Sequence, residues 1–137
     1  MRELAGTSVN GSDRLVHYGE LELPALSPSQ GENLAWRWAA PTLGTNDDWE
    51  EEGWYDSEEP NYDYSTGGSS NGGVIGHFTQ MVWDETTKLG CGIARTDEIL
   101  TIRGQDWDGE SEYSVCRYAK PGNWVGENLE HVQRRRS

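Results

Sequence analysis

Residues 76–92 read GHFTQMVWDETTKLGCG, and this stretch decides the fold because the hydrophobic period changes within it. Phe78, Met81 and Val82 are spaced i, i+3 and i+4, which places them on one side of a helix near the start of the stretch. From Leu89 onward, apolar residues alternate with small or polar ones, and that period is typical of a strand. The stretch therefore predicts a short helix followed directly by a strand.

The chain that follows this stretch continues the strand pattern. Short alternating runs predict strands at 89–93, 99–103 and 112–118, joined in one antiparallel sheet. Residues 104–110 (GQDWDGE) are rich in turn-forming types and predict the hairpin connection. Pro121-Gly122-Asn123 predicts a tight turn that closes the last strand.

The chain before this stretch favours helices. Good helix formers at 31–40 predict one helix, and the acidic, tryptophan-bearing segment 47–59 predicts a second that ends at Pro60. Residues 65–73 (STGGSSNGG) bury little apolar surface, so we expect an exposed and mobile loop. Helices first and strands last indicate an α+β fold with helices against one sheet.

The composition indicates one acidic domain. Its 137 residues suit one core rather than two, and 11 Lys+Arg against 24 Asp+Glu give a formal charge of −13. This charge repels phosphate backbones, so we expect no nucleic-acid partner. Much of the acid lies in 46–64, which is interpreted as a solvated face because it lacks the ordered ligand spacing of a Ca²⁺ loop. No apolar run is long enough to cross a bilayer, and residues 1–6 lack the apolar core of a signal peptide.

Three segments, in order, resemble the signatures of one family. Residues 76–92 are similar to the first signature of the CAP superfamily, which unites cysteine-rich secretory proteins, antigen 5 and plant pathogenesis-related proteins. Residues 115–124 (VCRYAKPGNW) resemble its second signature, and 31–36 (GENLAW) resembles a shorter motif that follows its first helices. The resemblance covers roughly 17–128 and implies an α-β-α sandwich with a three-stranded antiparallel sheet between helical layers.

The chain departs from the family pattern at its amino end. The family places a long helix before its first cavity histidine, whereas sixteen residues precede His17 here and 1–13 show no helical period. We therefore expect an irregular segment at 1–13, a CAP domain with a truncated N-terminal helical layer at 14–128, and a basic tail at 129–137.

The resemblance implies that His17, Glu32, Glu58 and His77 surround one cleft. Glu58 is assigned to the second acid position by counting back from the following aromatic residues, while counting forward from the preceding Trp-Tyr pair gives Ser57 instead. Imidazole is a common metal ligand, so His17 and His77 are candidate Zn²⁺ ligands with the carboxylates completing the shell. The alternative is a hydrogen-bonded polar cluster that needs no metal.

The resemblance also places Cys91 and Cys116 on neighbouring strands and implies a disulfide between them. Such a bond implies an oxidising compartment, so we expect an extracellular protein, although this chain shows no signal peptide. His131 lies in the polar tail and is expected to be inert.

A secreted binding module is the function that the resemblance implies, either as a defence or effector protein or as a lipid-binding protein with a sterol ligand. Trp83, Trp107, Tyr118 and Trp124 are candidate walls of an apolar groove, although such rings more often belong to a core. The alternative is a divalent-metal-dependent hydrolase that uses the same cleft. No Gly-x-Ser-x-Gly element or reactive-cysteine context supports acyl transfer, so we expect a non-enzymatic monomer that requires no cofactor and binds a lipid or a protein partner.

Overall fold

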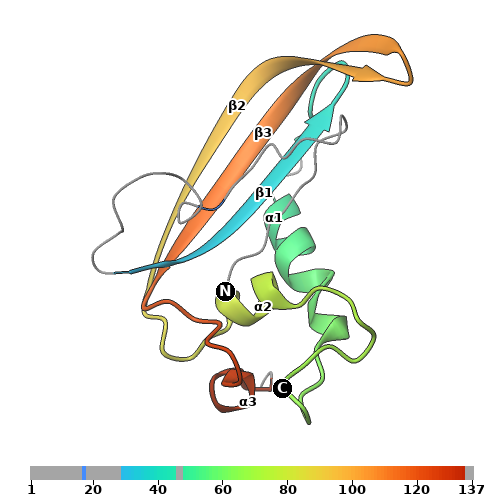
Figure 1. Cartoon of the computed structure of the whole chain (residues 1–137). Helices are drawn as coiled ribbons and strands as arrows, with labels where there is room; N and C mark the ends of the chain where they lie inside the picture. The colour runs from blue at the N-terminus through green and yellow to red at the C-terminus, as the bar shows by residue number, and fades with distance from the viewer. Residues whose placement is uncertain (1–16, 18–28, 46–47, 135–137) are drawn as a thin grey trace.

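The computed structural model describes residues 17, 29–45 and 48–134. Three strands form one antiparallel sheet: β1 (Gly31–Ala39), β2 (Lys88–Ile102) and β3 (Gln105–Ala119). The helical segments are short: α1 (Trp49–Glu51), the π-helical turn η2 (Glu52–Asp56), the 3-10 turn η3 (Glu59–Asn61), α2 (Gly76–Met81) and α3 (Asn128–His131). The α+β class and the three-stranded antiparallel sheet are confirmed (Figure 1).

The first strand lies where a helix was expected. β3 is central in the sheet, with β1 along one edge and β2 along the other. The helix predicted at 31–40 is wrong, because these residues form β1 and pair with β3 along the whole strand. Leu34, Trp36 and Trp38 are two residues apart and so lie on one face of the strand. Pairing with β3 overrides the helix propensity of the residues between them.

β2 and β3 form one long hairpin. The runs at 89–93 and 99–103, predicted as separate strands, both lie in β2 except for Arg103, which is in the turn. The connection predicted at 104–110 is also wrong, because the turn consists of Arg103 and Gly104 alone and β3 begins directly after them. Their φ angles are 53° and 78°. Two successive positive φ angles are what a type I′ turn requires, and such a turn joins strands through two residues.

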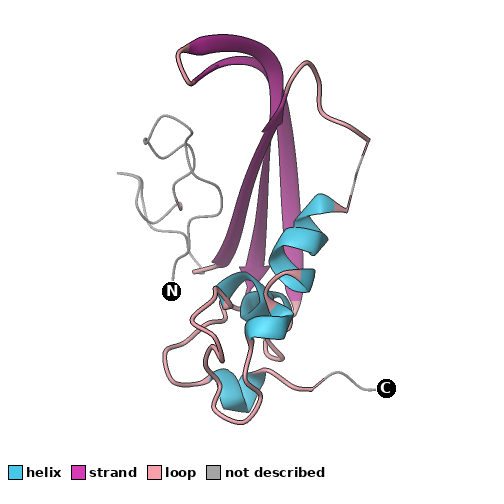
Figure 2. Ribbon diagram, turned by 90° about the vertical axis from the view of Figure 1, so that its right-hand side faces the viewer, coloured by secondary structure: helices cyan, strands magenta, loops and turns pink. Residues whose placement is uncertain are grey.

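A helical layer covers one face of the sheet. Figure 2 shows the helices beside one end of the sheet, while the tip of the hairpin extends beyond them. Trp54 in η2 is 4% exposed and packs in a core cluster with Ala35, Cys116 and Tyr118. The acidic segment predicted as a helix is thus helical over most of its length, and the helix predicted after Gly76 is confirmed as α2.

A second core cluster lies under α2 and reaches the carboxyl end of the chain. Phe78 in α2 is 1% exposed and packs with Tyr62, Trp83 and Val132. Val132 also pairs with Trp83 in an isolated antiparallel bridge. Within the segment expected to be a basic tail, residues 129–131 belong to α3 and Val132 packs in this core cluster. The expectations for 1–13 and for a truncated helical layer concern residues outside the described ones.

A charged cluster crosses all three strands on the helical face. Glu112 of β3 faces Arg37 of β1 and Arg95 of β2 in register, and its side chain is 6% exposed. Its Oε1 lies 2.9 Å from Nη2 of Arg37, and its Oε2 accepts a hydrogen bond from Nε of Arg95 at 2.5 Å. Burial raises the pKa of Glu112, but the hydrogen bond from Arg95 and the charge of Arg37 outweigh burial and hold the pKa below its usual value.

The disulfide between Cys91 and Cys116 is confirmed. The two cysteines are direct partners in the register of β2 and β3, and their Cα atoms lie 4.1 Å apart. The bond therefore links neighbouring strands of the hairpin rather than separate layers.

The loop at 65–73 is exposed along most of its length, as expected, and its mobility stays a prediction. Several of its backbone amides are held locally: Ser65 N–H donates to Oδ1 of Asp63 and Gly73 N–H to Oδ1 of Asn71, both at 2.8 Å.

Candidate functional site: two histidine–glutamate pairs beside an apolar groove

A buried pair joins His77 at the start of α2 to Glu58 in the turn before η3. Nδ1 of His77 lies 2.6 Å from Oε2 of Glu58. Oε1 of Glu58 accepts hydrogen bonds from the backbone N–H groups of His77, at 2.9 Å, and Phe78, at 3.2 Å. The carboxylate thus satisfies two amides of the first turn of α2, and as an acceptor it places the ring proton of His77 on Nδ1. Ser57, the alternative for this position, is exposed and donates to the backbone oxygen of Gly53.

Two further contacts fix the position of His77. The indole of Trp54 stacks on its ring, with the centroids 5.9 Å apart and the planes at 12°. Asn33 on β1 donates to the backbone oxygen of His77 at 3.2 Å and to the Tyr118 hydroxyl at 3.1 Å. Burial raises the pKa of Tyr118 to about 12, although the hydrogen bond from Asn33 opposes that rise. The phenol is therefore neutral at physiological pH.

A second pair joins His17 to Glu32 on β1. Nδ1 of His17 lies 2.9 Å from Oε1 of Glu32, and His17 is 3% exposed. The other oxygen of Glu32 accepts a hydrogen bond from Nε of Arg117 at 3.1 Å, and Arg117 is the register partner of Glu32 on β3. Glu32 therefore bridges an imidazole and a guanidinium.

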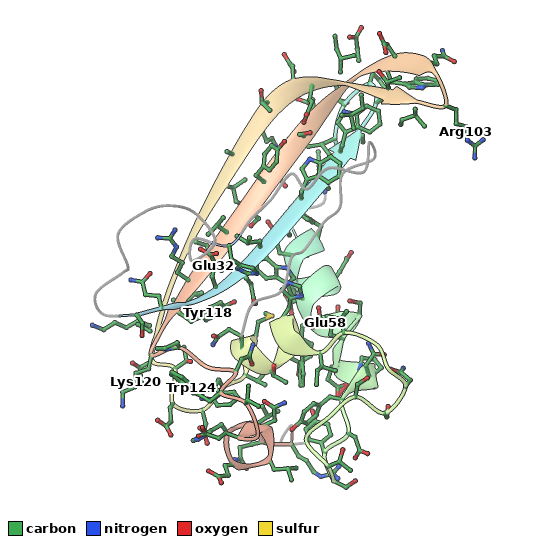
Figure 3. The ribbon with its side chains drawn as sticks, in the orientation of Figure 1. Glu32, Glu58, Arg103, Tyr118, Lys120 and Trp124 are labelled. Atoms are coloured by element: carbon green, nitrogen blue, oxygen red, sulfur yellow. A yellow bond between two sulfur atoms is a disulfide. The ribbon has the colours of Figure 1, made fainter. Side chains whose placement is uncertain are left out.

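The two pairs are separate units in the structure. Asn33 points toward His77 and Tyr118, and because successive strand residues point to opposite faces, Glu32 points to the other face of β1. Figure 3 shows Glu32 at the sheet and Glu58 among the helices. Within the described residues, no three of His17, Glu32, Glu58 and His77 bring ligand atoms within 4.8 Å of one another. Each pair matches the hydrogen-bonded alternative, while the shared cleft and its zinc stay predictions.

An apolar groove of about 320 Å³ lies between the α1–η2 segment and the outer strand β2. Apolar side chains and the disulfide form most of its lining: Trp54, Met81, Leu89, Cys91, Ile93 and Cys116. Ser114 and Tyr118 of β3 add polar groups, and Asp48, Glu50 and Glu51 form an acidic rim. Leu89 and Ile93 are 66% and 62% exposed. Trp54 lines this groove and also stacks on His77, so the groove adjoins the buried pair.

The four aromatic rings proposed as groove walls do not lie together. Tyr118 lines the groove, whereas Trp83 is 3% exposed inside the second core cluster. Trp107 is 43% exposed on the hairpin. Trp124 lines a different hollow, also of about 320 Å³, beside Lys120 (Figure 3). Of the two rings on β3, Tyr118 and Trp107 are an odd number of positions apart and therefore point to opposite faces of the strand.

His131, which was expected to be an inert residue of a polar tail, is packed against the second core cluster. Its ring stacks on Trp83 with the centroids 4.8 Å apart, and its Nδ1 lies 2.7 Å from Oδ1 of Asp84. The sequence could have predicted one of its contacts, because His131 and Glu127 are four residues apart and residues at that spacing are neighbours on a helix.

These features define a small α+β domain with one disulfide and two buried histidine–glutamate pairs. The chain belongs to the CAP (Cysteine-rich secretory protein) family, whose model matches residues 16–118. The resemblance drawn from the three sequence motifs is therefore confirmed.

Individual relatives come from animals, fungi and plants. The chain is 31% identical to "Salivary antigen-5" of Dipetalogaster maximus over 132 residues, which cover 92% of this chain and 45% of that protein. It is 36% identical to "Protein PRY2" of Saccharomyces cerevisiae over 125 residues, or 91% of this chain and 30% of that protein. It is 39% identical to "Pathogenesis-related leaf protein 4" of Solanum lycopersicum over 71 residues, or 52% of this chain and 38% of that protein.

The chain thus spans less than half the length of each of these relatives. Among the described residues, none of the helices is long and apolar enough to cross a membrane.

Proposed function

We propose that the chain is a secreted binding module that takes a neutral amphipathic lipid of the sterol class in the groove between α1–η2 and β2. The observation that carries the proposal is the open apolar wall formed by Leu89 and Ile93. The volume of about 320 Å³ lies within the range of small-molecule pockets, which is about 300 to 1,000 Å³. Burying these side chains under a ligand removes apolar surface from water and favours binding.

The charges around the groove favour a neutral ligand. Asp48, Glu50 and Glu51 line it on the side of α1. These carboxylates repel a fatty-acid carboxylate or a phosphate headgroup, whereas a sterol carries only a hydroxyl. Ser114 and Tyr118 in the lining carry hydroxyl groups, and a hydroxyl can both donate and accept hydrogen bonds.

The disulfide supports secretion, because structural disulfides persist in oxidising compartments. The names of relatives support a role in defence or host interaction, since they include a salivary antigen and a pathogenesis-related protein. Those names describe no catalytic activity, and one further relative is named "Peptidase inhibitor R3HDML". We therefore assign a binding role that requires no cofactor, in preference to a metal-dependent hydrolase.

The test compares two isoleucines of one strand. Ile93 and Ile99 are both 62% exposed on β2, and they share a face because their positions differ by an even number, 99 − 93 = 6. Among the two, Ile93 lines the groove. We expect Ile93→Ser to weaken binding of the fluorescent sterol dehydroergosterol by about 5- to 30-fold, which corresponds to about 1 to 2 kcal/mol of lost apolar contact.

Binding can be followed by energy transfer from tryptophan to the bound sterol, because Trp54 lines the groove. Ile99→Ser is the matched control and should bind as the wild type does. Oleate should compete poorly because of the acidic rim. Equal binding by both variants would place the sterol elsewhere, and preferential binding of oleate would reject the charge argument.

A further inference from the structure

A histidine with four nearby carboxylates lies at the carboxyl end of the described chain, away from the groove. Its residues come from two segments: Asp84 and Glu85 follow α2, and Glu127, Glu130 and His131 lie at α3. The backbone joins the segments, because the N–H of Asp84 donates to the carbonyl of His131 at 3.0 Å. The ring of His131 is further oriented by its stacking on Trp83.

The two nitrogens of His131 have different surroundings. Nδ1 lies 2.7 Å from Oδ1 of Asp84, a distance typical of a charge-assisted hydrogen bond. Nε2 lies 3.3 Å from a Glu85 oxygen, 3.5 Å from a Glu127 oxygen and 4.0 Å from a Glu130 oxygen. Because Asp84 accepts the Nδ1 proton, the lone pair of a neutral ring is on Nε2, toward these three carboxylates.

We propose that His131, Glu127 and Glu130 bind a divalent transition-metal ion of the zinc type, with Asp84 orienting the ring. Tetrahedral zinc with bonds of about 2.0 to 2.1 Å holds its ligand atoms about 3.3 to 3.4 Å apart. The distance of 3.5 Å from Nε2 of His131 to the Glu127 oxygen is close to that spacing and exceeds the length of a strong hydrogen bond. Ligand atoms of Glu127, Glu130 and His131 all lie within 4.8 Å of one another.

The chemistry of the donors favours zinc over calcium. An imidazole nitrogen is a common ligand of zinc, whereas calcium takes oxygen ligands alone and six to eight of them. In zinc sites the ring nitrogen of histidine that does not bind the metal commonly donates its hydrogen bond to a carboxylate, as His131 does to Asp84 here. The side chains of Glu127 and Glu130 are 45% and 74% exposed, which leaves positions for water on the ion. The ligating His131 is itself tied to the residues after α2 through Asp84 and Trp83, so the site lies against the second core cluster.

The test is calorimetric titration of the full chain with ZnCl₂ at pH 7.5, followed by MgCl₂ and CaCl₂. One zinc per chain should bind, with much weaker binding of the other two ions. Glu127→Gln/Glu130→Gln should weaken zinc binding at least tenfold, and Asp84→Asn should weaken it by about 10- to 100-fold, as for other second partners of ligating histidines. His131→Gln should abolish the binding.

Asp97→Asn/Asp108→Asn is the matched control, because it removes the same charge from exposed positions on the hairpin. This control should bind zinc as the wild type does. A wild-type chain that binds no zinc, binding that survives His131→Gln, or an equal loss in the control would each overturn the proposal. Circular dichroism and thermal unfolding of each variant exclude a trivial loss of fold, and the Glu127/Glu130 variant keeps His131 and its stack on Trp83.

Discussion

Replacing Glu112 by Gln removes the negative charge that lies between Arg37 and Arg95 and keeps the size of the side chain. Glu112 is the central member of the charged cluster that crosses the three strands. Its side chain is 6% exposed, so water cannot take over its role in the folded state. The variant therefore leaves two guanidinium groups close together without the carboxylate between them.

The magnitude follows from the exposure of the partners. Breaking a buried ion pair costs about 3 to 5 kcal/mol, and a hydrogen bond to a charged group contributes about 1.5 to 3 kcal/mol. The side chains of Arg37 and Arg95 are 19% and 42% exposed. In the variant, water therefore hydrates Arg95 more readily than Arg37, and losing the ion pair with Arg95 costs less free energy than losing the one with Arg37. Gln also keeps one carbonyl acceptor. We expect the free energy of unfolding to fall by about 2 to 3 kcal/mol at pH 7.

Urea unfolding followed by tryptophan fluorescence measures this change, with the disulfide kept oxidised. Asp97→Asn is the control on the same face of β2, because Asp97 is exposed and stands opposite Glu110, a residue of like charge. That control should be neutral or slightly stabilising. A double-mutant cycle of Glu112→Gln with Arg95→Gln should give a coupling energy of about 1 kcal/mol.

The pH dependence has a defined sign. Because the folded pKa of Glu112 lies below its usual value, the charge contributes stability above the unfolded pKa of about 4.3. That contribution is lost as the pH falls through the folded pKa. The difference between the wild type and Glu112→Gln should stay constant from pH 7 to about 5 and shrink below about 4.3. A difference below about 0.5 kcal/mol at pH 7, or one that grows in acid, would refute the reasoning.

Three further predictions concern packing, the disulfide and the buried pair. Gly109→Ala should lower the stability measured by thermal unfolding by about 1 to 3 kcal/mol, because the new Cβ atom would lie 2.5 Å from an indole carbon of Trp38 on β1. Gly92→Ala is the control: no atom lies within 4 Å of its new Cβ, so the melting temperature should not change. Reducing the bond between Cys91 and Cys116 should cost about 3.5 kcal/mol in urea unfolding, and insensitivity to reductant would contradict this. Glu58→Gln should lower stability by about 2 to 4 kcal/mol and speed amide exchange in α2, and unchanged exchange there would count against its capping role.

Local patterns predicted the helix after Gly76 and the strand character of 112–118, because their apolar residues follow one period without interruption. They failed at 31–39, where alanine, leucine and arginine favour a helix and only the distant partner β3 makes the segment a strand. They failed again at 104–110, where turn-forming residue types lie in a strand. The turn sits one step earlier, at the two residues with positive φ.

For the candidate site, the sequence predicted which residues take part but not how they are arranged. Residues inside signature motifs, such as Glu32 and His77, could be selected from sequence, and the structure gives each a histidine or carboxylate partner. The arrangement of these residues in space could not be predicted, because it depends on which face of β1 Glu32 and Asn33 each occupy. His131 was missed because its partners Asp84 and Glu85 are remote in sequence, and only the packing of Val132 on Trp83 brings them near.

The order of the strands constrains how the chain can fold during synthesis. β1 pairs with β3 alone, and the contact between Glu32 and Arg117 spans 85 residues. As the chain leaves the ribosome, β1 emerges long before its partner exists, and its tryptophans stay exposed until nearly the whole domain is available. Loop closure over such a distance slows folding. Strand β1 can therefore complete its pairing only after the whole of β3 has been synthesised, so a chain that stops before β3 leaves the backbone hydrogen-bonding groups of β1 without their partner strand.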